Sequence, residues 1–236
     1  MAYFTAETLA FLRGLAKNNS KAWFDENRAT YEAQLKAPYR ALAEDLVAEI
    51  RDREPEYQTD PTKAVYRINR DTRFSNDKTP YKTDLGITVG RHQKHDPSYP
   101  AYTVRLGLSG VAVGGGMYAP STTLRDQLRH YIGTNPEPLA AALSAAPYQA
   151  LFGGALQGER GKRVPKELAD LAADQPLVFN KQWVFWVGYP DPDLLLSDDL
   201  GGFILDHWDA ARPVNEYFKS ALNALDGGRA SHDGDR

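Results

Sequence analysis

The stretch AYTVRLGLSGVAVGGGM, residues 101–117, decides the fold class. Residues 101–108 and 111–113 are typical of strands, and Ser109 with Gly110 predicts a hairpin turn between them. Consecutive strands with no helix between them favour antiparallel pairing, because parallel strands need a long crossover connection. The centre of the chain is therefore expected to form a mainly antiparallel sheet.

Three further segments extend this sheet on either side. Residues 64–70 alternate between apolar and polar side chains and predict a strand, and residues 85–89 predict another. The polar, turn-rich segment 71–84 separates the two. Residues 177–188 predict one or two strands after a long helical stretch.

Helices are predicted before and after the sheet by their start and stop residues. Thr5 and Ser20 are typical N-caps, and Pro38 suits the first turn of a third helix. Gly133 predicts the end of a middle helix, and Pro213 predicts the start of the last one. The sequence therefore indicates an α+β fold with an N-terminal helical subdomain, a central mainly antiparallel sheet and C-terminal helices.

The domain organisation follows from length and composition. A chain of 236 residues with 42% hydrophobic residues can form one domain, which we place at residues 4–225. No linker rich in Pro, Gly or Ser interrupts this range. Residues 226–236 consist mainly of Gly, Asp, Ser and Arg, and are predicted to be disordered.

Composition also restricts the classes of function. The formal net charge of −3 implies no overall attraction to nucleic acid or to anionic membranes. The absence of cysteine excludes disulfides and thiolate chemistry, and it fits a reducing compartment. No signal peptide or membrane-spanning stretch is recognisable. We expect a cytoplasmic protein with no membrane association, and its oligomeric state stays open.

One segment carries an unusual concentration of charge. Residues 67–82 hold five basic and two acidic side chains, a net charge of +3, so the rest of the chain has a net charge of −6. A local cation cluster on an acidic protein suits a small anionic ligand, in particular a phosphorylated one. We predict as ligand-binding residues Arg70, Arg73, Lys78, Tyr81 and Lys82. Asp71 and Asp77 are the candidates for acid–base catalysis, unless they are ion-pair partners of the arginines.

Two other interpretations of this segment remain open. Its arginines and aspartates could form a buried polar network with a purely structural role. Phe74 and Tyr81 could instead stack on nucleic-acid bases, which the net charge of the chain argues against. Whether the protein is an enzyme is left undecided.

Two other motifs are interpreted as structural. His92, His95 and Asp96 could bind a metal ion, but they lie in a predicted loop without fixed geometry, so we expect no metal site. The glycine run 114–116 lacks the fingerprint of a dinucleotide or phosphate loop and favours a close approach of another element. We expect no cofactor.

Several motifs together resemble a known family. These are NNSKAWF at residues 18–24, followed by Arg28 and Tyr31; RDTRFSNDKTPYK at residues 70–82; and GGGMY at residues 114–118, followed by Pro120. The pattern is similar to the bacterial and fungal family known as domain of unknown function 2461, and the resemblance extends from about Phe4 to about Leu225. It implies a one-domain protein, with no established activity and no assigned catalytic residue.

Overall fold

The structure, a computed structural model, describes residues 2–92 and 96–232, with side chains described as far as residue 226. The Cα positions divide into two compact units. The first unit comprises Met1–His95, Thr103–Val113 and Gly188–Asp206, and the second comprises Asp96–Tyr102, Gly114–Val187 and His207–Arg236. Each unit is described by itself below, and the single domain expected at residues 4–225 stays a prediction.

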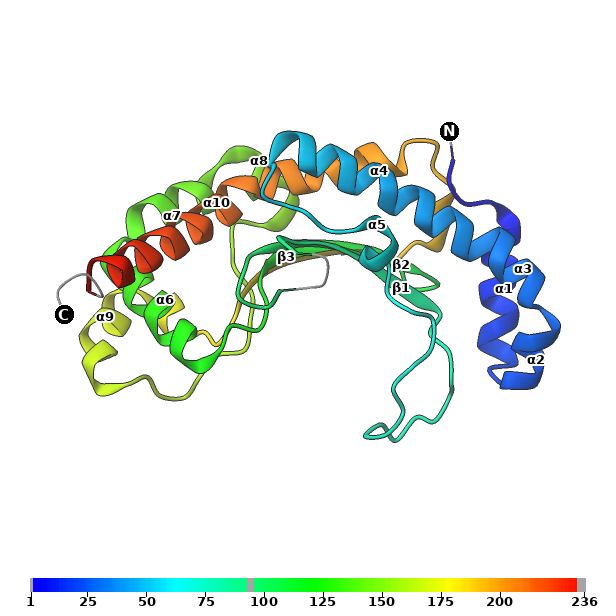
Figure 1. The fold of residues 1–236 in the computed structure, drawn as a ribbon, viewed down its shortest axis with the longest axis horizontal. Helices are drawn as coiled ribbons and strands as arrows, with labels where there is room; N and C mark the ends of the chain where they lie inside the picture. Colours follow the sequence, from blue (N-terminus) through cyan, green and yellow to red (C-terminus); the bar gives the residue numbers. More distant parts are fainter. Residues whose placement is uncertain (1, 93–95, 233–236) are drawn as a thin grey trace. The chain divides into compact units, whose positions relative to one another are not determined.

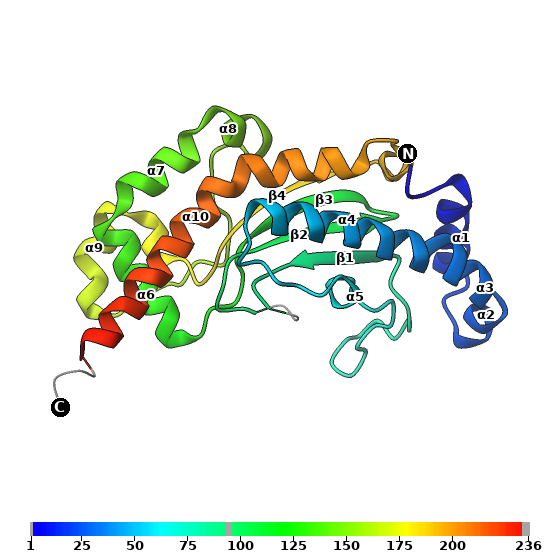
Figure 2. The ribbon, with the colours of Figure 1, turned by 45° about the horizontal axis from the view of Figure 1, so that its top comes forward.

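The α+β fold class is confirmed, with helices first, a four-stranded antiparallel sheet and a long C-terminal helix. The strands are β1 (Asp84–Val89), β2 (Ala101–Gly107), β3 (Gly110–Met117) and β4 (Trp183–Tyr189). They are hydrogen-bonded in the order β1-β2-β3-β4, and Figure 2 shows them side by side in that order. Sequence order and spatial order agree, as expected for strands joined without crossovers.

The first unit begins with the predicted helical subdomain. Its helices are α1 (Ala6–Lys17), α2 (Lys21–Glu26), α3 (Arg28–Tyr31), the π-helical turn η1 (Glu32–Lys36) and α4 (Ala37–Arg53). The predicted N-caps are confirmed: the Thr5 N–H donates to the Thr8 hydroxyl at 3.1 Å, and the Ser20 hydroxyl accepts from the Trp23 N–H at 3.3 Å. Pro38 lies in the first turn of α4, also as predicted.

The strand predicted at residues 64–70 is wrong. Helix α5 (Pro61–Ala64) occupies its start, and only isolated bridges follow, from Val65 to Ile87 and from Asn69 to Tyr81. The physical reason is a local cap: the Asp60 carboxylate accepts from the Thr62 N–H at 2.9 Å, immediately before a helix that begins with proline. The capped helix extends to Ala64, so the chain at the start of the predicted strand is helical despite its alternating apolar and polar side chains.

Helix α4 covers one face of the part of the sheet that belongs to the first unit. Its apolar residues, such as Leu42 and Leu46, are buried, and the Tyr39 hydroxyl donates to the Leu106 carbonyl on β2. The opposite face of the strands is polar, since the Thr88 and Thr103 hydroxyls lie 3.0 Å apart there. The loop between α5 and β1 leaves the sheet on the side away from α4 (Figure 1). This loop carries the basic segment.

The predicted hairpin is present, one residue earlier than expected. Strand β2 ends at Gly107 and β3 begins at Gly110, so the turn is formed by residues 108–109. Gly110 has a φ of +94°, and a Cβ atom there would lie 2.0 Å from the Tyr189 carbonyl oxygen. A side chain would therefore meet both backbone strain and a clash.

The second unit holds most of the remaining helices. These are α6 (Thr122–Thr134), α7 (Pro136–Ser144), α8 (Ala146–Phe152), the 3₁₀ turn η2 (Lys166–Leu168), α9 (Ala169–Asp174) and the 3₁₀ turn η3 (Pro176–Phe179). Gly133 does not end α6. It lies inside the helix, where a Cβ atom would lie 2.7 Å from the Leu171 Cβ, so its role is close packing against α9.

The last helix differs most from its prediction. A 3₁₀ turn η4 (Pro192–Leu196) precedes α10 (Leu200–His232), and Pro213 lies inside α10 instead of starting a separate helix. Residues 226–232, predicted to be disordered, are assigned to the end of α10, and residues 233–236 lie outside the described part. Within the described residues, no helix is both long and apolar enough to cross a membrane.

Candidate functional site: a pocket around Lys82

The basic segment is anchored at its base by Asn19, which lies between α1 and α2. The Asn19 side-chain amide donates to the Tyr81 carbonyl at 2.9 Å, and its oxygen accepts from the Tyr81 N–H at 3.0 Å. The Tyr81 ring stacks on Phe24 with a centroid distance of 4.2 Å and is buried. One asparagine and one aromatic stack thus fix the backbone directly before Lys82.

Beside this anchor, the backbone of residues 68–70 is hydrogen-bonded to the backbone of residues 80–82, and we call these two stretches the arms of the segment. The Arg70 N–H donates to the Pro80 carbonyl and the Lys82 N–H to the Ile68 carbonyl, both at 2.8 Å. The arms therefore hold Arg70 and Lys82 on neighbouring stretches of backbone.

The tip of the segment is exposed and its charges pair locally. The Asp71 carboxylate accepts from the Arg73 Nε at 3.0 Å and from its Nη2 at 2.7 Å, and these hydrogen bonds lower the pKa of Asp71. The Lys78 ammonium donates to the Thr72 carbonyl at 2.8 Å. The Phe74 side chain is 96% exposed.

Arg70 and Asp77 form a second pair nearer the base. The Arg70 guanidinium donates to the Asp77 carboxylate and to the Thr79 hydroxyl. Asp77 also accepts from the Thr79 N–H at 2.9 Å. The hydrogen bond from Arg70, followed by those from Thr79, lowers the pKa of Asp77 to about 2. Both candidate acids are therefore ion-pair partners of arginines in this structure, and a carboxylate with so low a pKa is a weak general base near neutral pH.

A concave surface lies between the base of the segment and the polar face of the sheet. We call it the Lys82 pocket, and it has two lobes, because Lys82 and Asp84 line two adjoining cavities. The larger lobe has a volume of about 410 Å³, and its polar lining includes Asn19, Arg70, Asp77, Thr79, Lys82 and Asp84. The smaller lobe has a volume of about 230 Å³, and it is lined by Tyr66, Lys82, Asp84, Leu85, Gly86 and Arg105. Every lining residue belongs to the first unit.

Lys82 is the central cation of this pocket. Its ammonium group donates to the Arg67 carbonyl at 3.1 Å and lies 5.8 Å from the centroid of the Tyr66 ring. No carboxylate lies within ion-pair distance of it among the residues that the structure describes. Burial lowers the pKa of Lys82, and repulsion by three guanidinium groups lowers it further, those of Arg67, Arg105 and Arg70.

Asp84 is the carboxylate that both lobes share. One of its oxygens accepts from the Ser109 N–H at 2.8 Å, and the other accepts from the Thr83 hydroxyl at 3.2 Å. The side chain is therefore held in a fixed position at the start of β1.

The structure brings some of the predicted site residues together and leaves others apart. Arg70, Tyr81, Lys82 and Asp77 line the larger lobe. Arg73, Lys78 and Asp71 lie at the exposed tip of the segment and do not line the pocket.

Sequence reasoning missed most of the other residues that line the pocket, and we consider four of them: Asn19, Tyr66, Asp84 and Arg105. Arg105 could have been recognised in the sequence, because it is the only charged residue in β2. In the structure it lies exposed between the buried Val104 and Leu106. The other three are ordinary polar or aromatic residues, and only the fold places them beside Lys82.

Two other motifs were considered in the sequence, the histidine-containing loop and the glycine run. Residues 93–95 lie outside the described residues, so the histidine-containing loop is not tested. In the glycine run, a Cβ atom at Gly114 would lie 2.3 Å from the Trp186 ring and one at Gly115 2.7 Å from the Phe185 ring. These glycines let the large side chains of β4 lie against β3.

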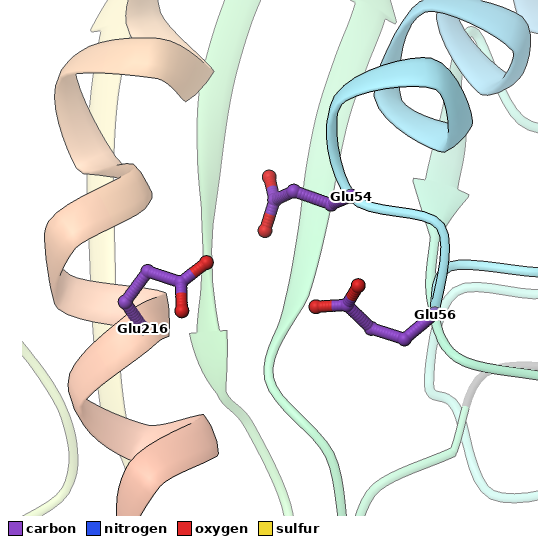
Figure 3. Close-up of side chains that lie close together, drawn as sticks. All are labelled: Glu54, Glu56 and Glu216. Carbon is purple, nitrogen blue, oxygen red and sulfur yellow. The ribbon is translucent and has the colours of Figure 1, made fainter.

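Three glutamates are shown together in Figure 3. Glu54 and Glu56 follow the end of α4 and belong to the first unit, whereas Glu216 lies on α10 in the second unit and pairs with Lys219. Acidic groups alone do not define a metal site, and these three glutamates are divided between the two units. We therefore infer no site from them.

Comparison with known proteins gives one finding. No curated protein matches the chain. The sequence profile of a family described as "conserved hypothetical protein (DUF2461)" matches residues 7–217, which include the α1–α2 anchor, the basic segment and every residue of the Lys82 pocket. The chain therefore belongs to this family, domain of unknown function 2461, as its motifs indicated.

Proposed function

We propose that this protein binds a small anionic ligand, carrying a phosphate group, in the Lys82 pocket. The observation that supports the proposal is the environment of Lys82, a half-buried ammonium group beside three arginines and without a carboxylate partner in the described structure. Repulsion by these guanidinium groups disfavours the charged form of Lys82, and an anion bound beside the ammonium group would favour it.

The chemistry of the surrounding groups fits a phosphate group. Arginine offers a planar fork of donors and lysine a compact point charge, and both form charge-assisted hydrogen bonds with phosphate oxygens. Arg105 and Arg70 lie on either side of Lys82, one in each lobe. A ligand at Lys82 would therefore be within reach of donors from two directions.

The proposal concerns binding and leaves catalysis open. Asp71 and Asp77 hold arginines in place and have lowered pKa values, so neither supports an acid–base role at neutral pH. The cytoplasmic location and the absence of a cofactor remain predictions from the sequence.

A structural role is the second candidate, and one observation favours it. The double hydrogen bond between Asn19 and Tyr81 ties the basic segment to the helical subdomain. The ion pairs of Asp71 and Asp77, however, lie at the surface, where such pairs contribute little to stability. Nucleic-acid binding receives less support, because Tyr81, one of the two aromatic residues considered for stacking, is buried against Phe24, while the other, Phe74, is exposed.

The test is calorimetric titration of the protein with inorganic phosphate, together with melting curves. We expect saturable binding, and at 100 times the dissociation constant phosphate should stabilise the protein by about 2.7 kcal/mol. Lys82→Met should abolish both effects. Lys78→Met is the matched control, since it removes the same charge from the same segment outside the pocket, and it should bind phosphate as the wild type does.

Two results would contradict the proposal. One is no binding of phosphate or of any phosphate ester to the folded wild type. The other is an equal loss of binding in the two lysine variants, which would indicate general attraction to a positively charged surface.

A further inference from the structure

The two lobes of the Lys82 pocket differ in charge. The residues that line the smaller lobe include two basic side chains, Lys82 and Arg105, and one acidic side chain, Asp84. The larger lobe is lined by two basic side chains, Arg70 and Lys82, and two acidic ones, Asp77 and Asp84, and also by Thr79 and Thr83, whose hydroxyl groups donate to these carboxylates. One lobe thus suits an anion, and the other suits a neutral group with many hydrogen bonds.

We propose that the ligand is a phosphorylated polyol, such as a sugar phosphate, whose phosphate group occupies the smaller lobe and whose hydroxyl groups occupy the larger one. This inference rests on the proposed function, because it assumes that an anion binds at Lys82. It goes further by naming the class of the rest of the ligand.

The size of the larger lobe supports a ligand that extends beyond the phosphate group. Its volume of about 410 Å³ lies within the range of roughly 300–1,000 Å³ that is usual for small-molecule pockets. A phosphate ion alone would leave most of this lobe filled with water. The charged side chains on its wall, those of Arg70, Asp77, Lys82 and Asp84, favour a polar occupant over a purely apolar one.

Asp84 provides the most specific argument. A carboxylate next to a phosphate group repels it, so Asp84 weakens the binding of any phosphate group in the smaller lobe unless another part of the ligand hydrogen-bonds to Asp84. Each Asp84 oxygen accepts one hydrogen bond, from Ser109 or from Thr83, and keeps acceptor capacity for another donor. A sugar hydroxyl is such a donor, whereas the fully ionised phosphate group of a phosphate monoester has no proton to donate.

The experiment compares three probes by calorimetric titration at pH 7: glucose 6-phosphate, inorganic phosphate and glucose. We expect the wild type to bind glucose 6-phosphate at least about tenfold more tightly than inorganic phosphate, the gain expected from one hydrogen bond to a charged group. Glucose alone should bind weakly or not at all, because it lacks the charge that Lys82 and Arg105 require.

The variant Asp84→Asn gives a test of opposite signs. It removes a negative charge and a hydroxyl acceptor, so we expect inorganic phosphate to bind equally or more tightly and glucose 6-phosphate about tenfold more weakly. Asp71→Asn is the matched control, since it removes the same charge from the exposed tip of the segment, and it should change neither affinity. Arg105→Gln should weaken both ligands.

The outcomes separate this inference from the proposed function. If inorganic phosphate binds but glucose 6-phosphate binds no more tightly, the inference is refuted and the proposed function survives. If Asp84→Asn weakens both ligands equally, Asp84 has a structural role and the inference also fails. If no probe binds, both proposals fail. The comparison of ligands on the wild type decides the question even if Asp84→Asn does not fold.

Discussion

The substitution Asn19→Ala tests the anchor of the basic segment. It removes two hydrogen bonds, of 2.9 and 3.0 Å, and leaves the buried N–H and carbonyl groups of Tyr81 without these partners. A hydrogen bond of this kind contributes about 0.5–1.5 kcal/mol, so the loss should be about 2 kcal/mol in the free energy of unfolding. For a chain of this length, that corresponds to a decrease of roughly 4–8 °C in melting temperature.

Asn18→Ala is the matched control for this experiment. Asn18 is the neighbouring residue and the same residue type, but its side chain makes one exposed hydrogen bond, to the Gly14 carbonyl at 3.0 Å. We expect it to cost less than about 1 kcal/mol. The assay is urea denaturation followed by tryptophan fluorescence and far-ultraviolet circular dichroism, because non-coincident transitions would reveal separate unfolding of the two compact units.

The same variant also tests the link between the anchor and the pocket. Lys82 directly follows Tyr81, so a loosened Tyr81 backbone should weaken phosphate binding in Asn19→Ala and not in Asn18→Ala. Equal stabilities of the two variants would refute the reasoning that Asn19 fixes the segment. Unchanged binding in a destabilised Asn19→Ala would show that the pocket does not depend on the anchor.

Two further predictions concern acid stability and packing. The pKa of Asp77 is lowered to about 2 from an ordinary 3.8, so its contribution to stability is full above the ordinary value and is lost as the pH falls through about 2. Urea titrations at pH 7, 4, 3 and 2 should therefore show that the difference in unfolding free energy between the wild type and Asp77→Asn decreases in the acid range. A constant difference would contradict this prediction. Gly114→Ala should destabilise the protein by about 1–3 kcal/mol, because its Cβ atom would lie 2.3 Å from the Trp186 ring. Gly188→Ala, whose Cβ atom would have no neighbour within 4 Å, is the control, and equal melting temperatures would show that both the Trp186 ring and the Phe185 carbonyl, 2.4 Å from the Gly114 Cβ position, can move aside at no cost.

Much of the local structure could be predicted from the sequence. Thr5 and Ser20 start helices through local hydrogen bonds, from the Thr5 N–H to the Thr8 hydroxyl and from the Trp23 N–H to the Ser20 hydroxyl, and both depend only on residues three positions apart. The stretch from Ala101 to Met117 forms two antiparallel strands because a short turn gives the chain no length for a crossover. The predictions that failed, at residues 64–70 and at Pro213, concern local patterns that two kinds of structure share.

The sequence by itself also determined the family, the α+β class and the concentration of positive charge at residues 67–82. Only the tertiary structure decided which of those charges meet. Asp77 pairs with Arg70, Asn19 reaches Tyr81 across 62 positions, and Arg105 on β2 lines the same lobe as Lys82, which precedes β1. Pairing over such separations depends on how elements pack, and packing leaves no periodic mark in the sequence, so a charged segment could be recognised before its pocket could.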